Sequence, residues 1–525
     1  MRANPLQKLH HILGYHWVIL VCALFFALFY HATFWRTLFV TTSHFPHPFL
    51  LWISIGVSLW IFLALSFELL STQRLYRFTL LPLIFLGAFS AYYMDNFNIS
   101  INPMIIESLL KTTPKEAADF VSFKVIFRMF SLALVPCILV LFVKPPKTRV
   151  ITKFILILSY ALLLLGIWLV CGKSITFAFK SYKPTLDMLN PIAPIRSTIR
   201  YLSDIASTPT IYTQVGPDAV LLPHDKPKIF VLVIGESARA QNLEFNGYKR
   251  PTNRYTKDLP NLINFSNFYS CGTITAISIP CMLTNLTHKT YTSRNLSLYR
   301  DNLLDIAQRA GYSVWWISNN GGACMGQVCR NIPHVSYYNG KHLDGDMLQE
   351  IVTLIKHAKQ NTFIVVNLHG SHGARYFERY PQNEEYFTPV CKNENLQECS
   401  KESLINAYDN SLRYSDFVLR SIINSLQDSP LATALWYVSD HGESLGEKGQ
   451  YMHGGLPYVF APQEQKHIAS FIWLGKDFST RYLTPLQARK DSLLNHDYVF
   501  HTILSLLNIR TKDCESALDL TRPMP

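Results

Sequence analysis

The sequence predicts a transmembrane domain of five helices followed by an α/β domain with a central, largely parallel sheet. The first third of the chain contains five long apolar runs, whereas short β-rich runs alternate with helical stretches after residue 227. With 525 residues the chain is also too long for one ordinary domain. We therefore divide it into membrane helices (1–172), a connector (173–226) and an α/β domain (227–525).

The apolar runs have the length of membrane spans. Each is close to the ~20 residues that a helix needs to cross hydrocarbon. The first is too long for a signal peptide and lacks a cleavage site with small residues, so it is expected to remain as an anchor. The five predicted spans are 17–36, 49–70, 78–94, 126–144 and 152–172.

Lysine and arginine predict the orientation of these spans, because cytoplasmic loops carry an excess of both. The N-terminal tail and the second and fourth loops are basic and are expected on the cytoplasmic side. Five crossings then place everything after residue 172 outside the cytoplasm. The basic residues in question are Arg2, Lys8, Arg74, Arg77, Lys144, Lys147 and Arg149.

Six of the ten cysteines form close sequence pairs in polar segments after residue 227 and predict disulfides. Disulfides imply an oxidising compartment, in agreement with the orientation of the spans. Reduced cysteines or a structural zinc site are the alternatives, but such a site favours Cys-x-x-Cys spacing. The pairs are Cys271/Cys281, Cys324/Cys329 and Cys391/Cys399; Cys22, Cys137 and Cys171 are expected to pack in spans, and Cys514 is left over.

The net charge of +12 suits acidic substrates or anionic lipid headgroups. A nucleic-acid partner is not expected, because no Lys/Arg cluster or nucleic-acid motif accompanies that charge. In the connector, residues 195–205 form an amphipathic stretch. It is either an interfacial helix on the bilayer or an ordinary linker helix.

Polar side chains follow several of the predicted strands. Ligands of such sheets bind beyond the carboxyl ends of the strands, so Glu236, His372, Asp440 and His441 are expected to converge. The predicted strands are Lys228–Ile234, Ser313–Ile317, Thr362–Leu368, Ala434–Val438 and Ala469–Trp473, and the predicted helices are 301–310, 345–359 and 402–427.

Glu236, Asp440 and His441 offer oxygen and imidazole ligands that suit zinc. An isolated Asp-His pair is usually structural, but this one follows a predicted strand and precedes a glycine. His372 and His453 are also followed by glycine, which allows close backbone approach. They are candidates to hold phosphate oxygens, fill a second metal site or protonate a leaving group.

Thr275 is the candidate nucleophile. A threonine hydroxyl needs a base or a metal to react at neutral pH. It lies where a turn enters a predicted helix, and the amides of a helix N-terminus favour a phosphate group. A Cys271–Cys281 bridge would make this loop rigid. Alternatively, Thr273, Thr275 and Ser278 are only helix-capping residues.

Several ordered motifs resemble those of phosphoethanolamine transferases, inner-membrane enzymes that modify lipopolysaccharide in Gram-negative bacteria. The resemblance covers nearly the whole chain. It includes Gly235-Glu-Ser-Ala-Arg239, Cys271-Gly-Thr-Ile-Thr-Ala-Ile-Ser-Ile-Pro-Cys281, Gly-Ser-His372-Gly, Ser-Asp440-His441-Gly-Glu-Ser and His453-Gly.

The resemblance implies an alkaline-phosphatase/sulfatase-like fold and a ping-pong reaction. Thr275 would become a phosphoethanolamine ester and would share one zinc ion with Glu236, Asp440 and His441. His372 and His453 would bind the transferred group or a second zinc ion. Phosphatidylethanolamine would be the donor and lipid A or another lipopolysaccharide glycan the acceptor. The enzyme would be a monomer in the bacterial inner membrane, with its catalytic domain in the periplasm.

Three positions depart from the family pattern. Met325 stands where many relatives have a lysine between the second pair of cysteines. Glu107, assigned here to the substrate-binding or second-metal group, aligns with an asparagine of lipid A-modifying members. Lys111 aligns with a threonine, unless a shift of one residue brings in Thr112. Lipid A phosphate, core sugars, Kdo and other glycans therefore all remain possible acceptors.

Three other functions share parts of this pattern. A sulfatase is excluded, since it needs Cys/Ser-x-Pro-x-Arg and Pro280 is followed here by Cys281-Met282. A phosphoglycerol transferase of the lipoteichoic-acid-synthase type would also use a threonine and a metal. A non-catalytic membrane scaffold would not need Glu236, Thr275 and the Asp-His pair together.

Overall fold

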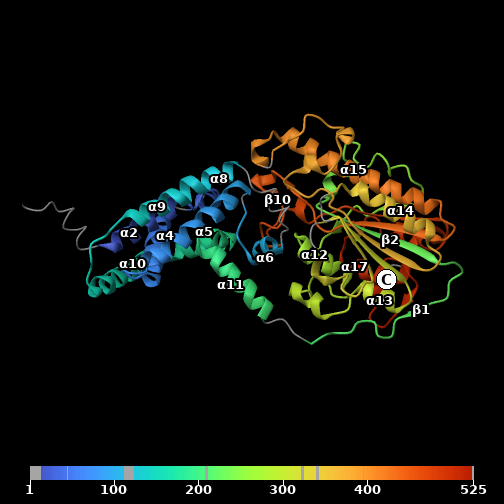
Figure 1. The fold of residues 1–525 in the computed structure, drawn as a ribbon, viewed down its shortest axis with the longest axis horizontal. Coiled ribbons are helices and arrows are strands. Elements are labelled where there is room, and N and C mark those ends of the chain that lie inside the picture. The colour runs from blue at the N-terminus through green and yellow to red at the C-terminus, as the bar shows by residue number, and fades with distance from the viewer. Residues whose placement is uncertain are drawn as a thin grey trace, which may run out of the picture. The chain divides into compact units, whose positions relative to one another are not determined.

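The computed structural model describes residues 14–43, 45, 47–97, 99–111, 123–181, 183–206, 211–320, 324–338, 342–393 and 395–522. These residues form two compact units, one up to Arg200 and one from Tyr201 onward, with Glu107–Lys111 counted in the second. Figure 1 labels some of their helices and strands.

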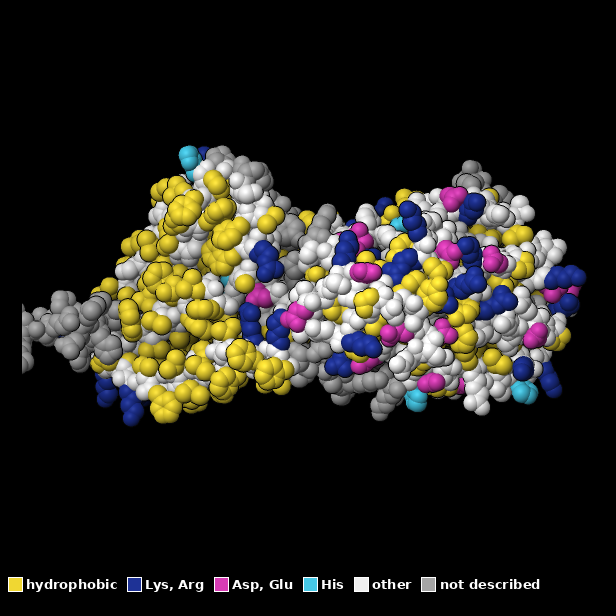
Figure 2. All heavy atoms as spheres, turned by 90° about the horizontal axis from the view of Figure 1, so that it is seen from above, with side chains coloured by type: hydrophobic (Ala, Val, Ile, Leu, Met, Phe, Trp, Pro, Cys, Tyr) yellow, Lys and Arg dark blue, Asp and Glu magenta, His cyan; other side chains and the backbone are white. Residues whose placement is uncertain are grey.

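The first unit is helical. Among the described residues, four helices are long and apolar enough to cross a membrane: Pro48–Leu70, Tyr76–Phe97, Phe123–Phe142 and Val150–Thr176. Apolar side chains cover much of its surface in Figure 2, as expected for helices that face lipid. Its helices are α2 (Tyr15–Phe29), α3 (Ala32–Thr42), α4 (Pro48–Leu70), α5 (Tyr76–Phe97), α8 (Phe123–Met129), η1 (Phe130–Leu134), α9 (Val135–Phe142) and α10 (Val150–Ser181), with α6 (Pro103–Lys111) and α11 (Ile192–Ala206) crossing the unit boundary.

The predicted first span, 17–36, is wrong as one continuous helix. The structure breaks it between α2 and α3 with a bend of 59°, so the number of spans is five only if this pair counts as one. His31 lies buried at the break and donates through Nδ1 to Phe26 O, while its Nε2 accepts from Asn190 N. A break in an apolar medium needs such partners for its polar groups.

The second unit contains a seven-stranded sheet in the order β3-β11-β8-β2-β7-β5-β6. Five neighbouring strands, β8 to β6, run parallel, whereas β11 is antiparallel to both β8 and β3. This confirms the largely parallel sheet, and all five predicted strands lie in it. The strands are β2 (Lys228–Gly235), β3 (Leu262–Asn264), β5 (Ser313–Ser318), β6 (His334–Tyr337), β7 (Thr362–Asn367), β8 (Ala432–Ser439) and β11 (Ser470–Leu474).

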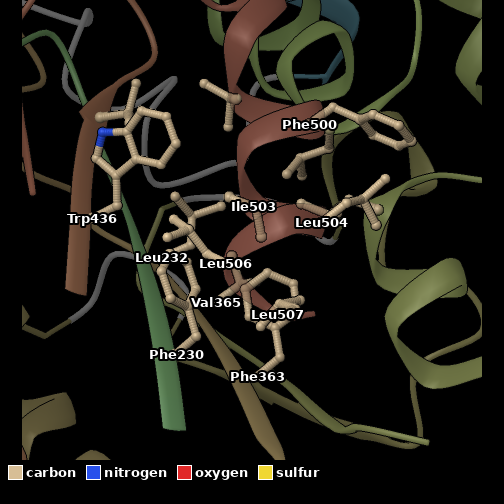
Figure 3. Packing of buried hydrophobic residues seen from close by; sticks show 14 of the residues in the cluster. Phe230, Leu232, Phe363, Val365, Trp436, Phe500, Ile503, Leu504, Leu506 and Leu507 are labelled. Carbon is tan, nitrogen blue, oxygen red and sulfur yellow. The ribbon is translucent and has the colours of Figure 1, made fainter. Parts of the chain in front are cut away.

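Helices cover both faces of this sheet. Alternate residues of β2 enter two apolar cores: Phe230 and Leu232 face one side, and Val231 and Val233 face the other. Figure 3 shows α17 packed on the first side. The helices are α13 (Leu303–Arg309), α16 (Lys476–Gln487) and α17 (Asp497–Leu506) against the first core, and α14 (Leu348–His357) and α15 (Lys401–Gln427) against the second. The helices predicted at 301–310, 345–359 and 402–427 are therefore confirmed.

Short elements complete the second unit. Three two-stranded ladders pair β1 (Val220–Leu221) with β13 (Ile509–Arg510), β9 (Ser444–Leu445) with β10 (Tyr451–Met452), and β4 (Phe268–Tyr269) with β12 (Leu494–Asn495). The helix α12 spans Thr275–Leu283.

All three predicted cysteine pairs form disulfides, and Cys514 is free. The surroundings of the second pair differ from the expectation of a polar segment. Cys329 is only 4% exposed and belongs to the first apolar core, because Val328 and Ile332 carry the same segment into that core. The disulfides are Cys271–Cys281, Cys324–Cys329 and Cys391–Cys399.

Candidate metal and nucleophile site

The central strands bring two carboxylates together at their carboxyl ends. β2 and β8 are parallel neighbours, with Gly235 opposite Ser439, so the residues that follow them are adjacent in space. Asp440 N donates to Gly235 O (2.9 Å), and Ser237 N donates to Asp440 Oδ1 (3.2 Å). The pairing of two buried strands thus positions both Glu236 and Asp440.

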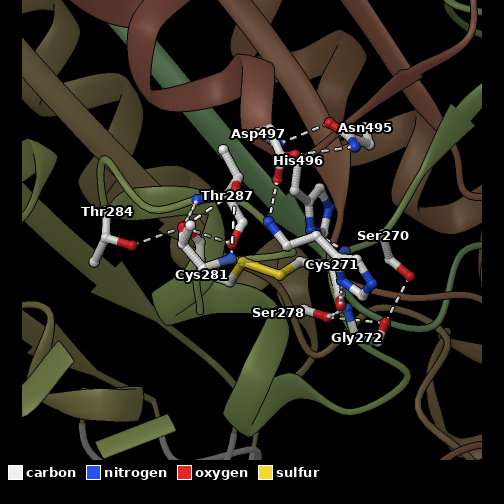
Figure 4. Close-up of a disulfide and its surroundings, with 12 residues drawn as sticks. Ser270, Cys271, Gly272, Ser278, Cys281, Thr284, Thr287, Asn495, His496 and Asp497 are labelled. Atoms are coloured by element: carbon white, nitrogen blue, oxygen red, sulfur yellow. Dashed lines mark hydrogen bonds between the residues drawn. A yellow bond between two sulfur atoms is a disulfide. The ribbon is translucent and has the colours of Figure 1, made fainter. Parts of the chain in front are cut away.

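Thr275 is the first residue of α12, as the sequence predicts. Its hydroxyl Oγ1 lies 3.0 Å from Glu236 Oε2 and 3.4 Å from His441 Nε2. The preceding loop is tied to the helix by the Cys271–Cys281 disulfide (Figure 4). The helix N-terminus therefore presents a hydroxyl directly to the carboxylate and imidazole group.

Glu236, His441 and His453 can hold a metal ion, because one ligand atom from each lies within 4.8 Å of the others. His441 Nε2 is also 3.3 Å from Asp440 Oδ2 and 3.2 Å from Glu236 Oε1. Asp440 is fully buried, and its Oδ2 accepts no hydrogen bond from any residue that the structure describes. A buried carboxylate oxygen of this kind is stabilised by a cation, and the oxygen and imidazole donors fit zinc.

The charges of this cluster depend on one another. Burial opposes ionisation of Glu236, but His441 and its neighbouring histidines hold the pKa of Glu236 well below its usual range. Burial and the negative charge of Glu236 raise the pKa of Asp440. Burial disfavours a charge on His441, yet Asp440 and Glu236 raise its pKa to about 10. Glu236 Oε1 and Asp440 Oδ2 both lie within 3.3 Å of His441 Nε2. Two buried carboxylates this close to one nitrogen need a positive charge between them, either a proton or a metal ion.

His453 is oriented by a buried carboxylate. Its Nδ1 lies 2.7 Å from Glu443 Oε2, and Tyr376 donates its hydroxyl proton to the other oxygen of Glu443. The rings of His441 and His453 have centroids 4.0 Å apart. His372 joins this group, with its ring centroid 5.8 Å from that of His453. The structure therefore brings both predicted accessory histidines to the cluster.

Three further side chains shape the site and were not predicted. Asn320 Nδ2 and Ser237 Oγ each donate to Glu236, over 2.7 and 2.8 Å. Asp344 accepts from the backbone of His369 and Gly370 and so fixes the loop that leads to His372. Asn320 follows β5, so the position of polar residues after strands could have revealed it, whereas no pattern pointed to Asp344.

The residues that depart from the family pattern lie in two short helices. Glu107 is buried in α6, and Lys111 ends that helix. Thr112 falls outside the described residues. Met325 begins a short 3₁₀ helix and packs against the first core. Any role of Glu107 in substrate binding stays a prediction.

The second disulfide serves the scaffold and supplies no ligand to the cluster. Cys329 is buried in the first core, and its partner Cys324 packs against the same core. The sulfur atoms of Cys324 and Cys329 are bonded to each other, so neither is a thiolate that could bind zinc. The Cys324–Cys329 disulfide therefore agrees with the predicted pairing.

Comparisons with known proteins agree with this geometry. Residues 228–509 match the family model "Sulfatase", and residues 59–205 match "Phosphoethanolamine transferase EptA/EptB". Phosphoethanolamine transferase EptA of Salmonella typhimurium is 34% identical over 467 residues, 84% of each chain. Phosphatidylethanolamine transferase Mcr-1 of Escherichia coli is 34% identical over 473 residues, 83% of this chain and 84% of Mcr-1.

Two solved structures extend the comparison. The lipooligosaccharide phosphoethanolamine transferase A of Neisseria meningitidis superposes with a TM-score of 0.90 at 28% identity, over 96% of this chain and 97% of its own. The C-terminal periplasmic domain of EptC from Campylobacter jejuni gives a TM-score of 0.55 at 36% identity, over 60% of this chain and all of that domain. The chain belongs to the phosphoethanolamine transferase family.

Proposed function

We propose that this protein transfers phosphoethanolamine from phosphatidylethanolamine to lipid A or another lipopolysaccharide glycan through an ester on Thr275. The observation that carries the proposal is the position of Thr275 Oγ1, within reach of both Glu236 Oε2 and His441 Nε2. The names of the relatives, EptA and Mcr-1, support the transferred group and the lipid donor.

Glu236, Asp440, His441 and the hydroxyl of Thr275 would hold zinc, and His372 and His453 are the candidates for a second ion. A bound zinc ion would lower the pKa of the threonine hydroxyl and would offset negative charge on the phosphoryl group. The unsatisfied Asp440 Oδ2 and the His441 imidazole are the observations that support this ligand set.

The reaction has two displacements at phosphorus. In the first, Thr275 Oγ attacks the donor phosphorus, the bond to the glycerol oxygen breaks, and diacylglycerol leaves. In the second, an acceptor oxygen attacks and the bond between Thr275 and phosphorus breaks. Glu236 Oε2 is in reach of the proton of Thr275, and the departing glycerol oxygen would take up this proton.

We assign the catalytic domain, residues 227–525, to the periplasmic side of the bacterial inner membrane. The apolar helices, the basic loops between them and three disulfides support this assignment. Loss of negative charge from lipid A would weaken binding of cationic peptides such as polymyxin. Residues 1–172 form the anchor of what we propose to be a monomer, and 173–226 link the two parts.

Mass spectrometry tests the proposal. The purified full-length protein, incubated with phosphatidylethanolamine, should carry a phosphoethanolamine adduct on the peptide that contains Thr275. Lipid A from cells with the gene should carry added phosphoethanolamine that cells without it lack. An adduct formed only with phosphatidylglycerol would instead support a phosphoglycerol transferase, and a protein with neither adduct nor lipid product would be a scaffold.

A further inference from the structure

His496 lies fully buried at the N-terminus of α17, between the nucleophile loop and the end of β8. Cys271 N donates to His496 Nδ1 over 3.0 Å, and His496 Nε2 lies 2.9 Å from Ser439 O. Figure 4 shows this imidazole beside the Cys271–Cys281 disulfide. One side chain therefore bridges the segment that carries Thr275 and the segment that carries Asp440.

The two backbone partners define the tautomer of this ring. An amide N–H can only donate and a carbonyl oxygen can only accept, so Nδ1 must lack a proton and Nε2 must carry one. Burial lowers the pKa of His496 to about 3, in keeping with a neutral ring. A protonated ring would direct its Nδ1–H against the N–H of Cys271.

The backbone around His496 is held to the same loop. β12 pairs with β4, and His496 N donates to Tyr269 O two residues before Cys271. The next residue, Asp497, accepts from His288 N, and His288 Nδ1 donates in turn to Cys271 O. Backbone contacts with the segment around Cys271 therefore position the imidazole of His496, and the imidazole in turn supports that segment.

From this bridge we infer that His496 is a positioning residue, which holds the Thr275 loop at the distance from Asp440 and His441 that transfer requires. The inference rests on the proposed function. It predicts that loss of the hydrogen bond from Cys271 N lowers kcat more than loss of the bond to Ser439 O, because the bond from Cys271 N fixes the loop itself.

Two substitutions separate the two hydrogen bonds. In His496→Asn the amide oxygen takes the place of Nδ1 and still accepts from Cys271 N. In His496→Gln the amide nitrogen takes the place of Nε2 and keeps only the bond to Ser439 O. His501 offers matched controls, since it is also buried in α17 and its Nδ1 accepts from Glu515 N, away from the site.

The test measures kcat, KM and hydrogen exchange of the 270–283 segment in the full-length protein in detergent. His496→Gln should lower kcat at least tenfold with little change in KM and should speed exchange of this segment. His496→Asn should keep kcat within about threefold, and the Asn and Gln variants of His501 should change only the melting temperature.

The inference is overturned if His496→Gln keeps wild-type kcat and exchange, or if both His496 variants lose activity only in proportion to their melting temperatures. Either result would leave the proposed function intact, because the wild-type protein would still transfer. Absence of transfer by the wild type would refute the function instead, and exchange of the loop would still report on His496.

Discussion

Thr275 Oγ1 and Glu236 Oε2 lie 3.0 Å apart, although 39 residues separate them in the sequence. Glu236 follows the central strand β2, and Thr275 opens the helix α12. Ser237 and Asn320 also donate to this carboxylate, so its orientation does not depend on Thr275. The carboxylate is therefore already oriented toward the hydroxyl that we propose as the nucleophile.

Replacing Thr275 by alanine should reduce transfer below detection, because the hydroxyl that we propose to form the ester is lost. Thr275→Ser should retain partial transfer and the covalent adduct. Transfer from labelled phosphatidylethanolamine and the mass of the peptide measure both effects. Full activity of the alanine variant would show that another group is the nucleophile.

Glu236→Gln should lower the zinc content of the purified protein and abolish transfer, because a neutral amide is a poor zinc ligand. Elemental analysis after dialysis gives the metal content without reference to activity. Glu244→Gln is a suitable control, since Glu244 pairs with Lys257 outside the cluster. Equal zinc content in the two variants would remove Glu236 from the ligand set.

Glu443→Gln should reduce transfer by roughly 10- to 100-fold, in the range known for residues that orient a ligand or catalytic histidine. The substitution puts a neutral amide in place of the carboxylate that faces Nδ1 of His453. The loss should appear mainly in kcat, with an unchanged melting temperature. A variant with wild-type kcat would exclude this role for the carboxylate.

Removing the Cys271–Cys281 disulfide by two serine substitutions should lower the free energy of unfolding by about 2–4 kcal/mol and should also impair transfer. The Cys391–Cys399 disulfide closes a loop of similar length outside the site. Its removal should cost comparable stability but leave transfer intact. Thermal unfolding and transfer assays on both variants compare the effects, and identical activity losses would contradict a special role for the first bridge.

Acidification should lower the free energy of unfolding of the second unit because it protonates His501. Burial lowers the pKa of this folded-state imidazole from 6.5 to about 4, so the unfolded chain binds more protons between these values. The contribution of this pKa shift to the free energy of unfolding, at most about 3 kcal/mol, is present above pH 6.5 and is lost as the pH falls toward 4.

The variant His501→Asn tests this pH dependence. Its amide oxygen can still accept from Glu515 N, but the side chain no longer titrates. Its melting temperature should fall less steeply than that of the wild type between pH 6.5 and 4. Parallel curves would mean that His501 does not contribute.

The sequence predicted the strands that carry the site, because β2, β7 and β8 are buried on both faces and read as continuous apolar runs. The strands β3 and β6 were missed, since each is short and only partly buried. The break at His31 was also missed, because the residues that satisfy it include Asn190, far along the chain.

The candidate site could be predicted only in part for a similar reason. Glu236, Asp440 and His441 follow recognisable strands, and strand order was not needed to bring them to one edge. The contact of Asn320 with Glu236 depends on β5 lying two strands from β2, which periodicity does not reveal. Asp344 accepts from backbone amides of another loop, and the spacing of residues in the sequence does not reveal such contacts.

The pairing of β2 with β8 also has a consequence for the order of assembly. Ser237 and Asp440 are 203 residues apart in sequence, and contacts of such long range form late because the intervening chain must first be organised. No partial product of synthesis that ends before β8 can contain the complete ligand set. In the function that we propose, a metal ion would be captured only after β8 has joined β2 in the sheet, and the enzyme would acquire its activity from the metal supply of the compartment in which it works.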